Sequence, residues 1–213
     1  MAAEPPRRAR PRGERRRAEI LDAATQVFLE NGYGGATIDL VVARAGASKA
    51  TVYSFFGGKE GLFAAIVEER AERTLLAFLD ISVSDVDVPT ALAQIGRRFM
   101  EVAMAPGAVG IYRLILAEGA RFPELTRTFF RLGPDRICAY LASVFMNWQE
   151  RGLITVENHA LTAAQFLDAV RGDLLLRVVA GVPPDDLEAA VERHVRNAVQ
   201  TFWTGIRPAG GPS

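Results

Sequence analysis

A glycine-centred turn at Gly46-Ala47-Ser48 constrains the fold of this 213-residue chain more than any other short stretch. Before the turn, residues 38–45 carry apolar side chains at helical spacing, which predicts a short helix with Thr37 as its N-cap. Glycine adopts positive φ without steric cost, so the first residue of the turn is expected to end that helix. Ser48 then caps a second helix over residues 49–56. The stretch therefore predicts two short helices joined by a tight turn.

The second of these helices is expected to expose a polar face made of Lys49, Thr51, Tyr53 and Ser54. A cation, short hydroxyl donors and an amphipathic ring suit contacts to phosphates and base edges. In helix-turn-helix proteins, the helix that follows the turn is the one that enters the major groove. The pattern favours DNA binding, although an ordinary helical hairpin in an all-α core would show the same spacing.

Positive charge is concentrated at the N-terminus of a chain whose formal net charge is zero. Residues 1–17 contain seven arginines, Arg12 and Arg15 among them, and two glutamates, so this segment carries 7 − 2 = +5 and the remainder −5. A basic arm on an acidic body indicates an anionic partner. We predict that residues 1–13 are disordered when free and that the arm follows the DNA backbone or enters a minor groove. A solubilising tail is the alternative.

The remaining composition narrows the class of protein. Cys138 is the single cysteine, so an intramolecular disulfide is excluded and a reducing compartment is expected. The N-terminus lacks the apolar core of a secretory signal, and the longest apolar stretches are too short to span a bilayer. We therefore expect a cytoplasmic protein. No metal or cofactor is expected, because His159 and His194 show no ligand spacing and the sequence has no phosphate-binding glycine loop.

Helical patterns fill the rest of the chain and no strand pattern is evident, so the predicted fold class is all-α. One helix is expected over residues 14–31, and a long one of about 24 residues from Lys59 would connect two domains over about 36 Å. After a polar loop at 81–89, further helices are expected at 90–105, 107–119, 123–131, 134–151, 158–180 and 185–204, the last capped by Asp185 with Glu188. The predicted domains are the arm (1–13), a helix-turn-helix domain (14–58), a C-terminal domain (59–206) and a tail (207–213).

Residues 20–70 resemble the N-terminal DNA-binding domain of the TetR/AcrR family of transcriptional regulators. The matching features occur at the family's spacing and comprise Ala23-Ala24, Phe28, Gly32-Tyr33, Thr37, Ala43, Ala45-Gly46, Ser48, Tyr53, Phe56, Lys59-Glu60 and Leu62. Residues 112–141 and 165–176 more loosely resemble the AefR-like C-terminal subgroup of the same family. The resemblance implies a three-helix DNA reader followed by a helical, homodimeric, ligand-binding domain.

The same resemblance implies roles for individual residues at the DNA interface. Thr37 would bond a phosphate from the start of its helix, and Tyr53 and Lys59 would contact the DNA backbone. Lys49, Thr51 and Ser54 would face the groove, and Ser48 at the start of the same helix is assigned to the DNA interface with them. Phe55 stands where relatives often have His or Tyr, so one polar phosphate contact is expected to be missing.

The last two predicted helices carry broad apolar stripes and are the predicted dimer surface, as a four-helix bundle with two helices from each subunit. The stripe residues assigned to the interface are Leu167, Val170, Leu174, Val178, Val191, Val195, Ala198 and Phe202. An entirely intramolecular core is the alternative. Gly172, inside the first of these helices, is expected to permit close helix packing.

Aromatic and methionine residues in the C-terminal half, with a few polar groups between them, predict a cavity for an apolar or aromatic small molecule. The residues assigned to it are Phe99, Met100, Met104, Tyr112, Phe145, Trp148, Gln149 and Arg171. Ordinary core packing would account for the same residue types. Cys138 could sense oxidants or electrophiles, but a lone helical cysteine is more often a small buried apolar residue.

These observations together predict a ligand-responsive transcriptional regulator, a repressor that binds an inverted-repeat operator as a homodimer and leaves it when a small effector binds. An activator on the same scaffold is one alternative. A helical small-molecule carrier or enzyme with a vestigial helix-turn-helix is another, although the sequence displays no cluster of acid and base groups for catalysis.

Overall fold

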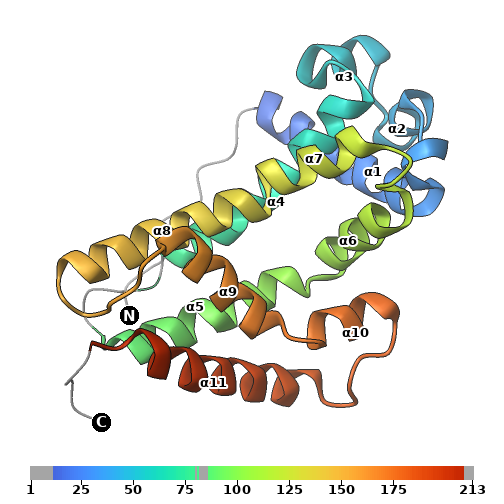
Figure 1. Cartoon of the computed structure of the whole chain (residues 1–213). Coiled ribbons are helices and arrows are strands. Elements are labelled where there is room, and N and C mark those ends of the chain that lie inside the picture. The colour runs from blue at the N-terminus through green and yellow to red at the C-terminus, as the bar shows by residue number, and fades with distance from the viewer. Residues whose placement is uncertain (1–11, 80, 82–85, 209–213) are drawn as a thin grey trace, which may run out of the picture. The chain divides into compact units, whose positions relative to one another are not determined.

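The computed structural model describes residues 12–79, 81 and 86–208. The chain divides into two compact units, Met1–Ile66 and Val67–Ser213. The predicted arm at residues 1–11, including its minor-groove contact, lies outside the described residues. Every regular element in the described ranges is a helix, which confirms the predicted all-α fold class (Figure 1).

The first unit contains α1 (Arg12–Gly35), α2 (Ile38–Ala45), α3 (Lys49–Phe56) and the first turns of α4 (Lys59–Leu79). Helix α1 begins earlier than predicted, so Arg12 and Gly13 are helical rather than part of a disordered arm. Its predicted end coincides with an interruption at Gly32, which has φ 69° and ψ 169°, and a short helical segment then continues to Gly35. Helix α4 has 21 residues, close to the predicted length.

The predicted caps of the two short helices are confirmed. The Thr37 hydroxyl accepts a hydrogen bond from the Leu40 N–H at 3.3 Å, and the Ser48 hydroxyl accepts one from the Thr51 N–H at 3.1 Å. Gly46 ends α2 in the left-handed conformation, with φ 58° and ψ 35°. Only a residue tolerant of positive φ fits this turn, and the turn fixes where α3 begins.

Three aromatic rings hold the first unit together around the end of α1. Phe28 stacks on Tyr33 at 5.6 Å between ring centroids, and Phe63 of α4 packs edge-on against both, at 6.2 and 5.9 Å. Val41 of α2 and Val52 of α3 are also buried. Aromatic pairs in these geometries stabilise beyond the area they bury, so α1 and the start of α4 form a firm support for the two short helices.

The second unit begins within α4 and continues through seven more helices. These are α5 (Val88–Ala103), α6 (Pro106–Glu118), α7 (Pro123–Leu132), α8 (Pro134–Glu150), α9 (His159–Arg171), α10 (Leu174–Ala180) and α11 (Leu187–Ile206). Helix α9 packs against both α8 and α11, and α11 also packs against α5 (Figure 1). Phe145, Trp148 and Phe166 are buried at the centre of this core.

Two sequence-based predictions in this unit were wrong in detail. The single helix expected over residues 158–180 is two helices, because Gly172 adopts φ 47° and ψ −144° and ends α9. The same residue does permit close packing, since a Cβ there would lie 2.9 Å from Cδ2 of the His194 ring on α11. The cap of α11 is Asp186 rather than Asp185, and its carboxylate accepts a 2.9 Å hydrogen bond from the Ala189 N–H.

Within the described ranges, the structure has no single helix that is both long and apolar enough to cross a bilayer. The pair α5 and α6, bent by 70°, passes the same length and composition test together.

Candidate nucleic-acid interface and ligand cavity

Helix α3 has one buried side and one exposed side. Val52 and Phe56 are turned inward, with 0% and 9% of their surface exposed, whereas Lys49 and Ser54 are exposed and Tyr53 keeps 53% of its surface open. The predicted polar face is therefore presented outward. Thr51 is half-buried, and its hydroxyl lies 2.8 Å from that of Ser48 at the start of the helix.

Lys49 is paired with an acidic residue of the preceding helix. Its ammonium lies 2.6 Å from the Asp39 carboxylate, and both side chains are more than half exposed. The Lys49 ammonium donates to the Asp39 carboxylate, and this contact raises the pKa of Lys49. A DNA phosphate would compete with Asp39 for the same ammonium.

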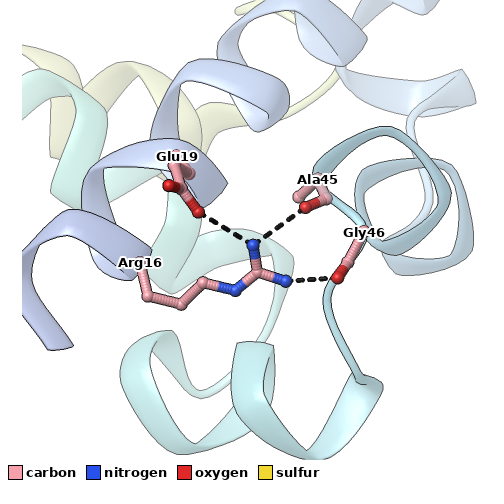
Figure 2. A network of polar contacts seen from close by, with 4 residues as sticks. All are labelled: Arg16, Glu19, Ala45 and Gly46. Carbon is pink, nitrogen blue, oxygen red and sulfur yellow. Dashed lines mark hydrogen bonds and ion pairs between the residues drawn. The ribbon is translucent and has the colours of Figure 1, made fainter. Parts of the chain in front are cut away.

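Arg16 of α1 binds the turn between α2 and α3 (Figure 2). Its Nη1 donates to the Ala45 carbonyl at 3.1 Å and to the Glu19 carboxylate at 2.8 Å, and its Nη2 donates to the Gly46 carbonyl. Carbonyl groups at a helix C-terminus lack intrahelical partners and carry partial negative charge, which a guanidinium satisfies. The sequence analysis missed this role, because nothing in the local pattern links residue 16 to the turn.

Lys59, predicted to contact a DNA phosphate, has its ammonium directed at the protein backbone. Its Nζ donates to the carbonyls of Tyr33 at 2.8 Å and Ala36 at 3.2 Å, and lies 4.5 Å from the centroid of the Tyr33 ring. The residue thus ties the end of α1 to the start of α4. The structure gives it a supporting role in the first unit.

A cleft of about 710 Å³ separates the start of α1 from α3. Its walls carry Arg12 and Arg15, both assigned to DNA by sequence, together with Arg16, Thr51 and Phe55. Glu19 is the acidic residue on this wall, and Arg16 is hydrogen-bonded to it. The structure thus brings three arginines beside the polar face of α3, where an anionic backbone would be favoured.

The second unit contains a largely apolar, partly open cavity of about 110 Å³. Residues from α4 to α10 line it, with Phe99, Phe129, Ile137 and Leu167 among the large apolar side chains. Its charged lining residues are Arg70 of α4 and Arg171 of α9. Arg171 donates a 3.1 Å hydrogen bond to the Tyr112 hydroxyl and pairs with Asp168 on the outer side.

A groove of about 360 Å³ adjoins this cavity and shares Tyr112, Arg171 and Leu175 with it. Leu176 and Val179 of α10 form one wall of the groove, and Leu116 of α6 is on the other. Helices α6 and α10 are fastened together, because Arg113 donates to the Val179 carbonyl at 2.7 Å and to the Val178 carbonyl at 3.0 Å.

Three of the eight residues assigned to ligand by sequence, Phe99, Tyr112 and Arg171, line the cavity. The other five do not. Met100, Phe145 and Trp148 are buried in the core, where Phe145 stacks on Trp148 at 5.6 Å. Met104 packs against the core, and the Gln149 side chain accepts a 2.8 Å hydrogen bond from the Val156 N–H. Cys138, left open as a sensor or a buried residue, lines the cavity, and burial raises the pKa of its thiol.

Most of the residues assigned to the dimer surface are covered by their own chain. Five of the eight are less than 9% exposed within a single subunit, namely Leu167, Val170, Leu174, Val195 and Ala198. Val191 and Phe202 are partly buried and pack against the same core, whereas Val178 packs against a smaller cluster of Val109, Leu175 and Val179. A partner subunit could not reach the five buried side chains without opening the core, so these five belong to an intramolecular core, which was the alternative expected from the sequence.

Two families match the sequence, and together they cover most of the described residues. Residues 20–66 match the family described as bacterial regulatory proteins, tetR family, and residues 90–205 match the AefR-like transcriptional repressor, C-terminal domain. With an outward-facing α3 after a glycine turn, these matches define the class as a helix-turn-helix transcriptional regulator, not an enzyme. The chain belongs to the TetR family, which confirms the resemblance seen in the sequence.

Individual relatives agree with this placement. The regulator UidR of Escherichia coli K12 is 28% identical over 195 residues, which cover 88% of this chain and 93% of UidR. The transcriptional repressor SCO4008 of Streptomyces coelicolor is 30% identical over 67% of this chain and 69% of its own length. Among solved structures, the flavonoid-responsive regulator FrrA is 29% identical, with a TM-score of 0.78 over 92% of this chain and all of FrrA.

Proposed function

We propose that this protein is a cytoplasmic repressor that binds an inverted-repeat operator as a homodimer and releases it when a small molecule occupies the cavity of the second unit. The observation that carries the proposal is the outward polar face of α3, with Lys49, Tyr53 and Ser54 exposed and the cleft arginines beside it. This arrangement supplies phosphate contacts around a helix that can enter a major groove.

Helix α4 belongs to both units, so it can couple ligand binding in the second unit to DNA binding by the first. Its first turns contribute Leu62 and Phe63 to the core of the first unit, and its later turns contribute Val67, Ala71 and Thr74 to the cavity wall. A ligand that favours a shifted α4 would change the distance between the two α3 helices of a dimer. Successive major grooves lie about 34 Å apart, and only a ligand with different affinities for the two spacings can move the equilibrium.

The relatives support two parts of this proposal, the response to a small molecule and the role as a repressor. FrrA is described as flavonoid-responsive, and SCO4008 as a repressor. For the dimer we retain the C-terminal helices but assign contact to their outward side chains, among them Leu161, which is 55% exposed. The buried stripe then supports the interface from within.

Gel shifts with the promoter region next to the gene, at stated salt, test DNA binding directly. Tyr53→Phe and Lys49→Ala should weaken binding while light scattering and circular dichroism show an unchanged, folded dimer. A strain that carries the promoter fused to a reporter distinguishes a repressor from an activator. Loss of the protein should raise reporter expression if it is a repressor and lower it if it is an activator. A monomer in solution, or unchanged affinity in both variants, would contradict the proposal.

A further inference from the structure

The cavity and the groove of the second unit are neighbours that share three lining residues, among them the polar pair Tyr112 and Arg171. A hydrogen bond joins these two side chains. The lining of the cavity is mostly apolar. The groove is flanked by Leu116 and Leu176, which are 63% and 62% exposed. A molecule that occupied both spaces would therefore lie against the shared residues, of which Arg171 is the charged one.

The charges that face the inner space have one sign. Arg70 and Arg171 line the cavity, and among the described lining residues none is an aspartate or glutamate. Asp168, which pairs with Arg171, borders only the groove, and its side chain is 65% exposed. A cationic ligand would meet repulsion here, and a neutral one would cover the guanidinium without replacing its hydration. An anion would gain charge-assisted hydrogen bonds.

Arg171 is held in place before any ligand arrives. One terminal nitrogen bonds Tyr112, the other bonds Asp168, and the guanidinium lies 6.0 Å from the centroid of the Phe99 ring. A guanidinium has five N–H donors in a planar fork, so donors remain to bind a carboxylate after these two bonds. A group fixed this way loses little conformational entropy on binding.

The inner volume sets the size of the apolar part. A protein cavity of about 150 Å³ lined by aliphatic and aromatic side chains takes up one benzene molecule. The present cavity, about 110 Å³ and walled by Phe99, Phe129, Ile137 and Leu167, is of that order. It therefore suits a single ring or a short branched chain, with any further part of the molecule in the groove.

We infer that the effector is an amphipathic acid, with an aromatic or aliphatic body in the cavity and a carboxylate or similar anion bound to Arg171 at the border of the groove. This inference rests on the proposed ligand response and narrows its chemistry. Arg70, whose guanidinium lies against the backbone at Gly107, supplies a second positive charge on the wall.

The single cysteine provides a readout that needs no DNA. Cys138 lines the cavity, so a bound ligand should slow its alkylation by N-ethylmaleimide, followed by intact mass. The probes are cinnamate, the isosteric cinnamamide and the cationic cinnamylamine. We expect cinnamate to protect Cys138 at a concentration about tenfold or more below that needed for the amide, and the amine to protect least.

Arg171→Gln should abolish the preference for the acid, whereas Tyr112→Phe, which keeps the guanidinium, should retain it. Equal protection by acid and amide, a preference that survives in Arg171→Gln, or no protection by millimolar cinnamate would overturn the inference. A gel shift of the unliganded protein separates the two proposals. Operator binding without Cys138 protection contradicts only the ligand class, and protection without operator binding contradicts only the proposed function.

Discussion

The Arg16 guanidinium of α1 donates a 3.1 Å hydrogen bond to the carbonyl oxygen of Ala45, the last residue of α2. A second nitrogen of the same group donates to the Gly46 carbonyl (Figure 2). One side chain thereby occupies the open end of α2 and fixes the turn from which α3 starts. This explains how the eight-residue α3, too short to be stable alone, is held in one position.

Replacing Arg16 by alanine should lower the free energy of unfolding by about 1–2 kcal/mol, because charge-assisted hydrogen bonds to the turn are lost from a partly exposed site. Urea unfolding followed by circular dichroism measures the change. Arg15→Ala is the matched control, since it removes the same charge from an exposed neighbour. Equal stability of the two variants would show that the contact with the turn is unimportant.

Lys59→Met and Lys49→Met should affect different properties, the first the stability of the fold and the second the affinity for the operator. Lys59 bonds two backbone carbonyls, so its loss should cost about 1–3 kcal/mol of stability. Lys49 is exposed, so its replacement should instead weaken operator binding. The slope of log affinity against log salt should also fall by the amount expected for about one phosphate contact. Urea unfolding and gel shifts at several salt concentrations test both. A Lys59→Met protein of normal stability with a reduced salt slope would restore the phosphate contact predicted from sequence.

Asp39→Asn should strengthen operator binding severalfold, because the Asp39 carboxylate competes with phosphate for the Lys49 ammonium. Fluorescence anisotropy with a labelled operator measures the gain, which should shrink as salt rises. Glu30→Gln, which removes a carboxylate paired with Arg44 at 2.5 Å elsewhere in the same unit, controls for net charge. If both variants gain equally, the effect is general electrostatics and not release of Lys49.

Leu174→Ala should lower the stability of the folded chain by about 2–5 kcal/mol, because this side chain is only 2% exposed within one subunit. Leu176→Ala, two residues further on the same helix and 62% exposed, should leave unfolding nearly unchanged. Light scattering over a range of concentrations completes the test. If Leu174→Ala dissociated the dimer without affecting the unfolding of the subunit, residue 174 would belong to the interface after all.

Local chemistry made the helix-turn-helix predictable. Thr37, Ser48 and Gly46 act on backbone groups within four residues of themselves, so the sequence contains the whole interaction. The supporting roles of Arg16 and Lys59 depend on partners at least 23 residues away, and no periodic pattern reports them. For Lys59, the family resemblance implied a DNA phosphate contact instead.

The second unit was harder to predict for a different reason. An apolar stripe shows that a helix face is covered, but not whether the same chain or a partner covers it, and Val170 and Val195 prove to be covered by the same chain. Aromatic composition likewise cannot distinguish a filled core from a cavity. Phe145 and Trp148 stack on each other, whereas Phe99 borders open space, and the difference depends on how the surrounding helices pack.

The bonds from Arg113 to the end of α10 have a mechanical consequence. They join α6 to α10, which carry the two walls of the groove, so they fix the separation of Leu116 from Leu176. Arg171 stands on α9, across the break at Gly172. A molecule wider than the groove would therefore have to displace α9, because the two walls cannot separate while the Arg113 bonds hold.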